Sequence, residues 1–252
     1  MRSRRWNRLA VVGIDPLDKT LEENLPRGFL ILVTGTAGSG TEMLAKQFAA
    51  NAGDEKVLYV STMERESTIL KTMEKYGWKA DMKVLDIASL HYDTVLKKEL
   101  EISTYRQEGI SVSDVKNLVL RHVKKINFMT LSLYEISKMT PPFRVVIDSL
   151  DFYFQHYGHE NVISMLTTVR AHVQHNACIA LVTMLKEAYP VEVHRVIEGL
   201  SDCIIELDIK YSEKGSEHYL TLRKVLNHPD KTGIYRCMIG ADGISIWSGI
   251  SR

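Results

Sequence analysis

The feature that most constrains the fold is an apolar run that leads directly into a glycine-rich turn. Residues 29–34, Phe-Leu-Ile-Leu-Val-Thr, are almost continuously apolar, which predicts a strand buried on both faces of a parallel sheet. Three glycines follow within six residues, Gly35, Gly38 and Gly40, and residues 42–52 have helical composition. Strand, glycine turn and helix in this order are typical of a loop that holds a phosphate at a helix N-terminus.

The same strand-and-helix alternation continues along the chain and predicts a mainly parallel sheet. Further buried strands are expected at 56–61, 82–87, 143–148 and 177–183, with helices at 66–76 and 161–175. A long amphipathic helix is expected from Ser113, a good N-cap, to Ile136, before Pro141. After Gly199, short alternating strands are expected at 203–207, 218–225, 234–239 and 244–247.

The predicted fold is therefore α/β, with helices on both faces of a mainly parallel central sheet and an antiparallel C-terminal extension. We expect one domain over 1–252, with an N-terminal lead-in at 1–28 and a place for an insertion at 89–112. No internal repeat or linker divides the chain.

Composition narrows the classes of function. Hydrophobic residues make up 45%, charged residues 25%, and the formal net charge is +1, which argues against a dedicated nucleic-acid binder. No apolar run approaches the ~20 residues of a membrane span. Three cysteines lie far apart, so we expect reduced core residues of a cytoplasmic protein and no metal site. The histidine pairs at 156/159 and 172/175 lack an evident third ligand.

The glycine loop departs from the phosphate-binding pattern at its two charged positions. That pattern is Gly-x-x-x-x-Gly-Lys-[Ser/Thr], in which the lysine neutralises phosphate and the hydroxyl holds Mg²⁺. Here Gly35 and Gly40 have the required spacing, but Thr41 stands at the lysine position and Glu42 at the hydroxyl position. Unit charges ~4 Å apart interact by about 1–4 kcal/mol, so losing the cation and gaining an anion both weaken phosphate binding.

The stretch from Ser39 to Glu42 also fits the capping-box pattern Ser-x-x-Glu. Such a box would let Glu42 accept hydrogen bonds from N–H groups that a phosphate otherwise occupies. We therefore expect either a self-capped loop or one that has lost tight nucleotide binding. The alternative, in which Glu42 points to solvent and nucleotide still binds weakly, stays open.

Several segments resemble the KaiC-like branch of the RecA superfamily of P-loop ATPases. The resemblance is collinear over nearly the whole chain, which makes it stronger than any single motif, and it implies a RecA-like P-loop NTPase fold. Its Walker A motif is the degenerate loop described above. The matching segments are Gly-Ile-Asp-Pro-Leu-Asp at 13–18, the turn at 25–28, Tyr-Val-Ser-Thr at 59–62, Val-Val-Ile-Asp-Ser at 145–149, and the strands at 201–207 and 239–244.

The resemblance implies a catalytic carboxylate just after the second strand. The family's glutamate there positions the attacking water, and the alignment puts Met63 at that position. Methionine cannot orient water. Glu64 is adjacent and becomes the candidate base if the alignment shifts by one residue.

The resemblance also implies a Walker B carboxylate and basic residues that reach across a subunit interface. Asp148 and Ser149 match the Walker B end in full. In the late Lys-x-Arg segment, Lys224 matches the lysine, while Leu226 replaces the arginine. The vestigial nucleotide-binding set is thus Gly35, Gly38, Ser39, Gly40, Thr41, Glu42, Asp148 and Ser149, with Lys224 as the candidate trans cation.

These changes predict a non-hydrolysing relative of an ATPase that acts as a binding or regulatory module. We expect no cofactor, with Mg-ATP bound weakly at most, and a protein or peptide partner such as an active paralogue. A homo-oligomer is compatible with this reading; a membrane or nucleic-acid partner is not expected. Two alternatives stay open: an unusual nucleotide-dependent ATPase with Glu42 as metal ligand and Glu64 as base, and a RecA-type DNA-associated accessory protein.

Overall fold

The computed structural model describes all residues except 1–10, 22–26, 108–125, 214 and 247–252. Its centre is a nine-stranded sheet with the order β3-β2-β4-β5-β1-β6-β7-β8-β9. In this spatial order the first six strands, β3, β2, β4, β5, β1 and β6, run parallel. From β6 onward each strand runs antiparallel to the one before it. The bounds are β1 Leu30–Gly35, β2 Lys56–Ser61, β3 Lys83–Asp86, β4 Phe143–Asp148, β5 Ile179–Leu185, β6 Cys203–Ser212, β7 Gly215–Val225, β8 Gly233–Gly240 and β9 Gly243–Ile246.

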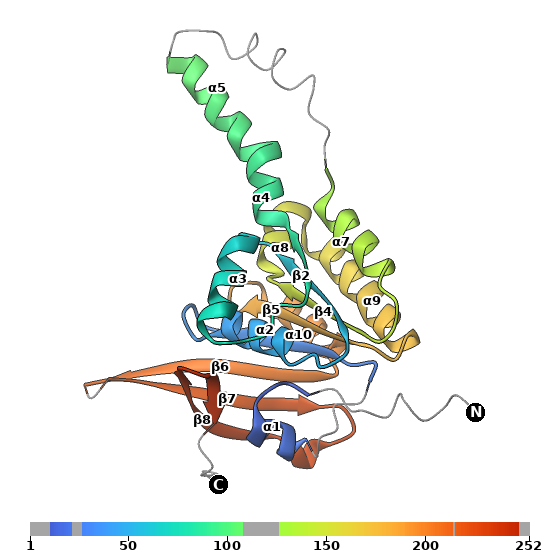
Figure 1. Cartoon of the computed structure of the whole chain (residues 1–252), viewed down its shortest axis with the longest axis vertical. Helices are drawn as coiled ribbons and strands as arrows, with labels where there is room; N and C mark the ends of the chain where they lie inside the picture. The colour runs from blue at the N-terminus through green and yellow to red at the C-terminus, as the bar shows by residue number, and fades with distance from the viewer. Residues whose placement is uncertain (1–10, 22–26, 108–125, 214, 247–252) are drawn as a thin grey trace.

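Helices cover both faces of this sheet, as predicted (Figure 1). One face packs against α1 (Asp15–Thr20), α2 (Thr41–Ala50) and α3 (Glu66–Lys75). The other packs against α4 (Ile87–His91), α7 (Phe128–Ser137), α8 (Asp151–Tyr157), α9 (His159–His175) and α10 (Val191–Leu200). Alternate residues of β1 show the division: Ile31 and Val33 lie in the α2-side core, Leu30 and Leu32 in the α10-side core.

The expected helix from Ser113 to Ile136 is not continuous. Ser113 itself lies outside the described residues, as do the apolar positions up to 123. Asn127 has an extended backbone (φ −88°, ψ 100°), and its side chain accepts a hydrogen bond from Thr130 N. A new helix, α7, therefore begins at Phe128, because the asparagine caps it and breaks the 3.6-residue repeat. The apolar spacing alone did not reveal this interruption.

The region around the expected insertion is helical as far as it is described. After α4 the chain passes through a π-helical turn, η1 (Tyr92–Leu96), into α5 (Lys97–Gln107). Figure 1 shows α5 rising away from the sheet as an arm. Within the part of the chain that the structure describes, no helix combines the length and apolar character needed to cross a membrane.

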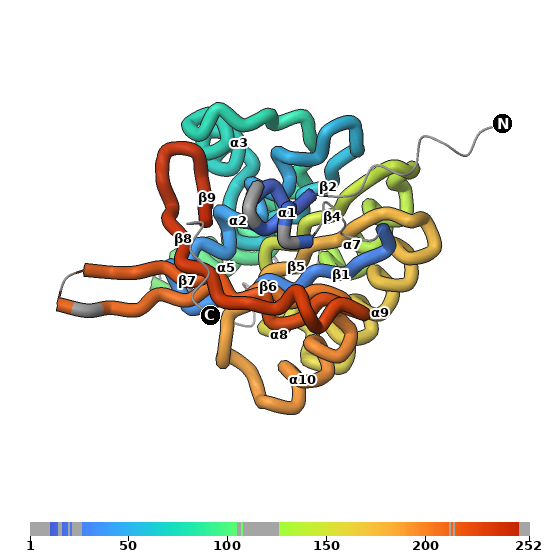
Figure 2. Tube along the Cα trace, turned by 90° about the horizontal axis from the view of Figure 1, so that it is seen from below, coloured from blue at the N-terminus to red at the C-terminus, as the bar shows by residue number. Residues whose placement is uncertain are grey.

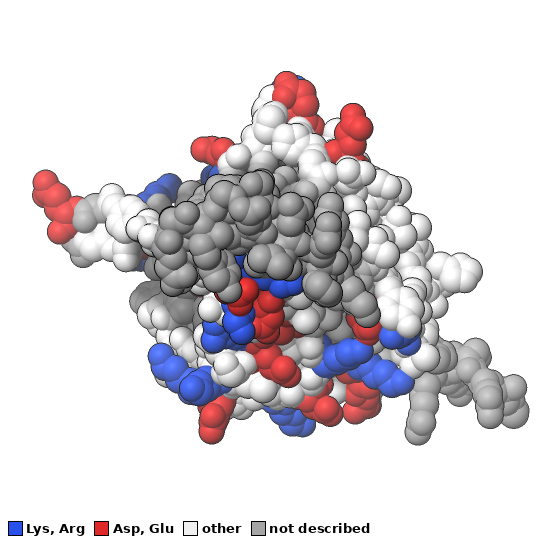
Figure 3. All heavy atoms as spheres, turned by 90° about the horizontal axis from the view of Figure 1, so that it is seen from above, with Lys and Arg blue, Asp and Glu red and all other residues white. Residues whose placement is uncertain are grey.

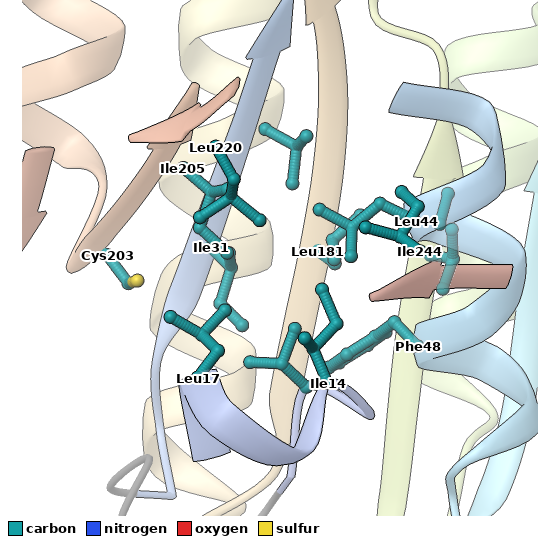
Figure 4. Close-up of a cluster of buried hydrophobic side chains, with 14 of the residues drawn as sticks. Ile14, Leu17, Ile31, Leu44, Phe48, Leu181, Cys203, Ile205, Leu220 and Ile244 are labelled. Atoms are coloured by element: carbon teal, nitrogen blue, oxygen red, sulfur yellow. The ribbon is translucent and has the colours of Figure 1, made fainter. Parts of the chain in front are cut away.

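The end of the antiparallel extension, β8 and β9, folds back so that β9 contacts α2. Figure 2 shows β6 and β7 as a long hairpin and the β8–β9 hairpin turned back beside α2. Gln47 of α2 joins these parts, because its amide donates to Gly13 O (2.6 Å) and its Oε1 accepts from Ile244 N (2.8 Å). In Figure 4, side chains of the lead-in, α2 and β9 meet in one apolar cluster that includes Leu17, Phe48 and Ile244.

Candidate functional site

The glycine loop lies where a phosphate-binding loop is expected, between the carboxyl end of β1 and the N-terminus of α2. Gly35 ends β1, and its Cα has no room for a side chain: a Cβ would lie 2.2 Å from Ser39 Oγ and 2.8 Å from Leu207 O. Gly38 (φ +81°) and Gly40 (φ +97°) have left-handed backbones, which glycine adopts at little cost. The backbone geometry and close packing of the loop therefore favour glycine at these positions whether or not a ligand binds.

The structure contradicts the capping box. Helix α2 begins at Thr41, and its N-cap is Gly40, so Glu42 occupies the second helical position and not the third that the box requires. No side chain caps the helix. Ser39 Oγ is buried without a hydrogen-bond partner, and Glu42 Oε2 lies 3.5 Å from Thr41 Oγ1. Among the described residues, no carboxylate caps the first N–H groups of α2 in the place of a phosphate.

A lysine that the sequence analysis did not single out lies beneath the loop. Lys46 is fully buried in α2, and its Nζ lies 2.5 Å from Glu64 Oε1 and 3.4 Å from Glu42 O. Glu64 follows β2 and is 29% exposed at its side chain. The candidate base therefore has an internal ammonium as its partner. No spacing in the sequence marks this pairing, because Lys46 and Glu64 belong to separate elements that only the fold brings together.

Asp148, at the carboxyl end of β4, accepts a hydrogen bond on each carboxylate oxygen. Tyr59 Oη donates to Oδ2 at 2.6 Å, and Thr183 Oγ1 donates to Oδ1 at 2.7 Å. Burial, and then the adjacent Asp148 carboxylate, raise the pKa of the Tyr59 phenol well above its usual value. The phenol therefore stays protonated and remains a donor. Ser149 N donates to Thr62 Oγ1 at 2.8 Å, which ties the ends of β4 and β2 together.

The site thus gathers acids and one internal cation. Glu42, Glu64 and Asp148 all act electrostatically on Tyr59, and the ammonium of Lys46 is paired with Glu64. Met63 is 70% exposed beside them. Among the described residues, no group of three or more His, Cys, Asp or Glu side chains is placed to hold a metal ion.

Comparison with known proteins identifies the family. A family model described as "ATPase: KaiC" matches residues 10–250. The chain belongs to the KaiC family of ATPases. The KaiC oscillator protein of Synechococcus elongatus is 26% identical over 240 residues, covering 93% of this chain and 43% of that protein. KaiC2 of Synechocystis is 23% identical over 239 residues, covering 93% of this chain and 39% of KaiC2.

A solved structure supports the fold in the same way. The KaiC-like protein of the archaeon Pyrococcus horikoshii superposes with a TM-score of 0.68 at 18% identity, covering 95% of this chain and 99% of that chain. The KaiC-like recognition and the RecA-like fold predicted from the sequence are confirmed by these comparisons. The chain spans about two fifths of the length of the curated KaiC relatives named above.

The two residues matched to the KaiC family's interface cations lie at the end of β7 and contact different parts of the fold. Lys224 of β7 donates from Nζ to Glu198 O of α10 at 2.9 Å, which places the ammonium at the negative end of that helix. Leu226 is half-buried against the α2-side core. A role for Lys224 across a subunit interface stays a prediction, and the lysine already has a partner within its own chain.

Charge is mixed on one face of the molecule. On the face shown in Figure 3, basic and acidic side chains are interspersed over the described atoms, with no basic stripe among them. The basic patch expected at Arg121, Lys124 and Lys125 lies outside the described residues. The described atoms visible on this face therefore form no electrostatic track of the kind that nucleic-acid binding uses.

Proposed function

We propose that this chain is a non-hydrolysing member of the KaiC family that serves as a binding or regulatory module for a protein or peptide partner. The observation on which this rests is the disposition of charge at the loop. Thr41 replaces the phosphate-binding cation, and the nearby ammonium, Lys46, is buried against Glu64. Neither residue is available to neutralise a γ-phosphate, and Glu42 adds a negative charge there.

Loss of hydrolysis has support of its own. Met63 stands where the family resemblance expects the water-activating carboxylate. Glu64, the adjacent acid, is bonded to Lys46 at 2.5 Å. Because one of its carboxylate oxygens is already occupied by the Lys46 ammonium, Glu64 is poorly placed to orient a water in its stead.

A protein partner fits the apolar side chains that flank the Walker B end. Met63 follows β2 and is 70% exposed, and Leu185 ends β5 and is 40% exposed. In the sheet order, β4 lies between these two strands, so the two side chains flank the edge that ends in Asp148. Exposed apolar groups beside a site that has lost its phosphate cation favour contact with protein over nucleotide.

Titration with Mg-ATP by calorimetry tests the proposal. We expect no binding in the micromolar range for the wild-type chain and measurable binding for Thr41→Lys/Glu42→Thr, because the glycine frame is intact. The matched control is Thr36→Lys/Glu42→Thr, which adds the same charge at the exposed Thr36 of the loop. Micromolar affinity in the wild type would contradict the proposal. A folded but silent double variant would show that more of the pocket has been lost than the cation.

Capture from native extracts tests the partner. The wild-type chain is compared with Met63→Lys/Leu185→Lys as bait, the variant keeping the fold but replacing the apolar flank with charge. We expect a specific protein that the wild type retains and the variant loses. Recovery of nucleotide or DNA alone by the wild type contradicts a protein-binding role.

A second candidate, weak nucleotide binding, is favoured by one observation. Because the capping box is absent, the N-terminus of α2 presents its N–H groups without a side-chain cap, and such termini attract anions. The same titration decides this candidate: saturable Mg-ATP binding at high concentration, abolished by Gly40→Val, supports it.

A further inference from the structure

A second polar site lies on the opposite face of the sheet from α2. A pocket of about 300 Å³ opens between α10 and the carboxyl ends of β1 and β5, with Glu206 of β6 and Arg223 of β7 also in its lining. This volume is at the lower limit of the ~300–1,000 Å³ typical of small-molecule sites. Neither the glycine loop nor Asp148 lines it. The residue from β1 is Thr34, which precedes Gly35 and points to the α10 side, as do Leu30 and Leu32.

Two polar atoms in the lining are buried and lack any hydrogen-bond partner. They are Thr34 Oγ1, in a residue only 3% exposed, and His194 Nε2 of α10. A buried polar atom without a partner costs about 1–3 kcal/mol, so such atoms are rare without a reason. Both atoms belong to one pocket, and a ligand with hydrogen-bond donors would satisfy both.

The charges in and beside the pocket favour a cationic ligand. Lys186 lies 2.9 Å from Glu206 and 2.9 Å from Asp208, and Arg223 lies 2.8 Å from Glu198 and 3.0 Å from Glu206. Glu187 also lines the pocket. Two cationic side chains thus face four acidic ones. An anion would meet a net negative field, whereas a cation would reduce it.

The two resident cations stay charged. Burial lowers the pKa of the Lys186 ammonium, but the hydrogen-bonded carboxylates of Asp208 and Glu206 offset this, so its pKa is raised overall. Burial likewise lowers the pKa of the Arg223 guanidinium, but the carboxylates of Glu198 and Glu206 raise it overall. The two side chains therefore remain cationic partners of these carboxylates at neutral pH.

We propose that this pocket binds a compact organic cation, an ammonium or guanidinium group. The N–H donors of the cation pair with Thr34 Oγ1, with His194 Nε2 and with the Glu198 carboxylate. An ammonium has three such donors and a guanidinium five, and a hydroxyl oxygen, a neutral imidazole nitrogen and a carboxylate can each accept from them. This site is separate from the glycine loop, so its existence does not depend on whether the loop binds nucleotide.

The group has two sources, a free amine or a basic side chain of a partner, and titration with two probes separates them. One probe is agmatine; the other is a blocked glycine tripeptide with a central arginine. Saturable binding of agmatine indicates a free cation, and binding of the peptide alone indicates a partner's side chain. Either outcome supports the site. Absence of saturable binding with both probes overturns it, as does inorganic phosphate binding as tightly as the cations.

Variants place the binding in this pocket. Thr34→Val removes the hydroxyl with almost no change in shape and is expected to weaken binding roughly three- to tenfold. Thr34→Ser restores the hydroxyl and is expected to retain binding. Glu198→Gln is expected to weaken it about tenfold or more. The control is Glu192→Gln, an exposed acid of the same helix outside the lining. Equal affinity in all four variants overturns the assignment, and circular dichroism confirms that each is folded.

Discussion

The Lys46 ammonium and the Glu64 carboxylate are 2.5 Å apart, one from the interior of α2 and the other from the turn after β2. This ion pair lies beneath the glycine loop, with Lys46 only 1% exposed at its side chain. In a phosphate-binding site the nearest ammonium would face the ligand. Here it faces the chain's own carboxylate, and this single relationship connects the stability of the loop region to the proposed loss of nucleotide chemistry.

Removing the two partners of this pair is expected to have unequal effects. Glu64→Gln leaves a buried ammonium without its anion and should destabilise the protein by about 3 kcal/mol, at the lower end for a broken buried pair. Lys46→Met leaves Glu64, which is 29% exposed and can hydrate, so about 1–2 kcal/mol is expected. The double variant should resemble Lys46→Met. Urea unfolding measures the cycle, and strictly additive effects would contradict a coupled pair.

A side chain at Gly40 is expected to disturb the packing of the C-terminal hairpin on the loop. Its backbone is left-handed (φ +97°), and a Cβ would lie 2.6 Å from Ile239 Cδ1. Gly53 is also left-handed (φ +62°) but has open space around it, which makes it the matched control. Both alanine variants should lose about 1–2 kcal/mol for the backbone, and Gly40→Ala should lose more. Adding Ile239→Val to Gly40→Ala should recover the stability that Gly40→Ala loses beyond Gly53→Ala. Equal losses of stability at Gly40 and Gly53 would argue against contact between the loop and the hairpin.

Two histidines are expected to make the protein less stable in mild acid. Burial, and then the neighbouring His156, lower the pKa of His91; burial, and then His175, lower the pKa of His172. The folded-state pKa values lie below the unfolded value of about 6.5. The contribution of the two neutral histidines to the free energy of unfolding is therefore complete above that pH and is lost as the pH falls through the folded values. Urea unfolding at several pH values should show this slope. His91→Gln and His172→Gln should each flatten it, and an unchanged slope in both would contradict the prediction.

Assembly is expected to be independent of ATP. Head-to-tail packing of RecA-type subunits gives rings or filaments, and in this family the nucleotide joins neighbours. Thr41 and Leu226 replace two of the cations involved, and Lys224 is bonded to Glu198 O of its own chain. Size-exclusion chromatography with light scattering should give the same mass with and without Mg-ATP. A hexamer that forms only with Mg-ATP would show that the interface cations still act.

Short stretches of the sequence specify the strands and the glycine loop without reference to the rest of the fold. The buried strands β1, β2, β4 and β5 were predictable because a strand covered on both faces needs a continuous apolar run, and residues 29–34 and 143–148 contain one. The glycine frame was equally local, since Gly38 and Gly40 adopt left-handed backbones that few other residues tolerate. The antiparallel strands after residue 203 were also predictable locally, because alternate residues of a strand share a face and produce a repeat of two residues.

Only the tertiary structure decided which polar groups, far apart in the sequence, become partners. The N-cap of α2 is Gly40 and not Ser39, because the turn from β1 places the glycine at the first helical carbonyl. Asp148 bonds Tyr59 and Thr183 through strand order, and Lys46 reaches Glu64 through the packing of α2 on β2. Hydrogen bonds and ion pairs depend on distances of a few ångströms between distant segments, and no periodicity records them. The sequence by itself therefore determined the sheet and its glycine loop, whereas the folded chain decided which charges meet there.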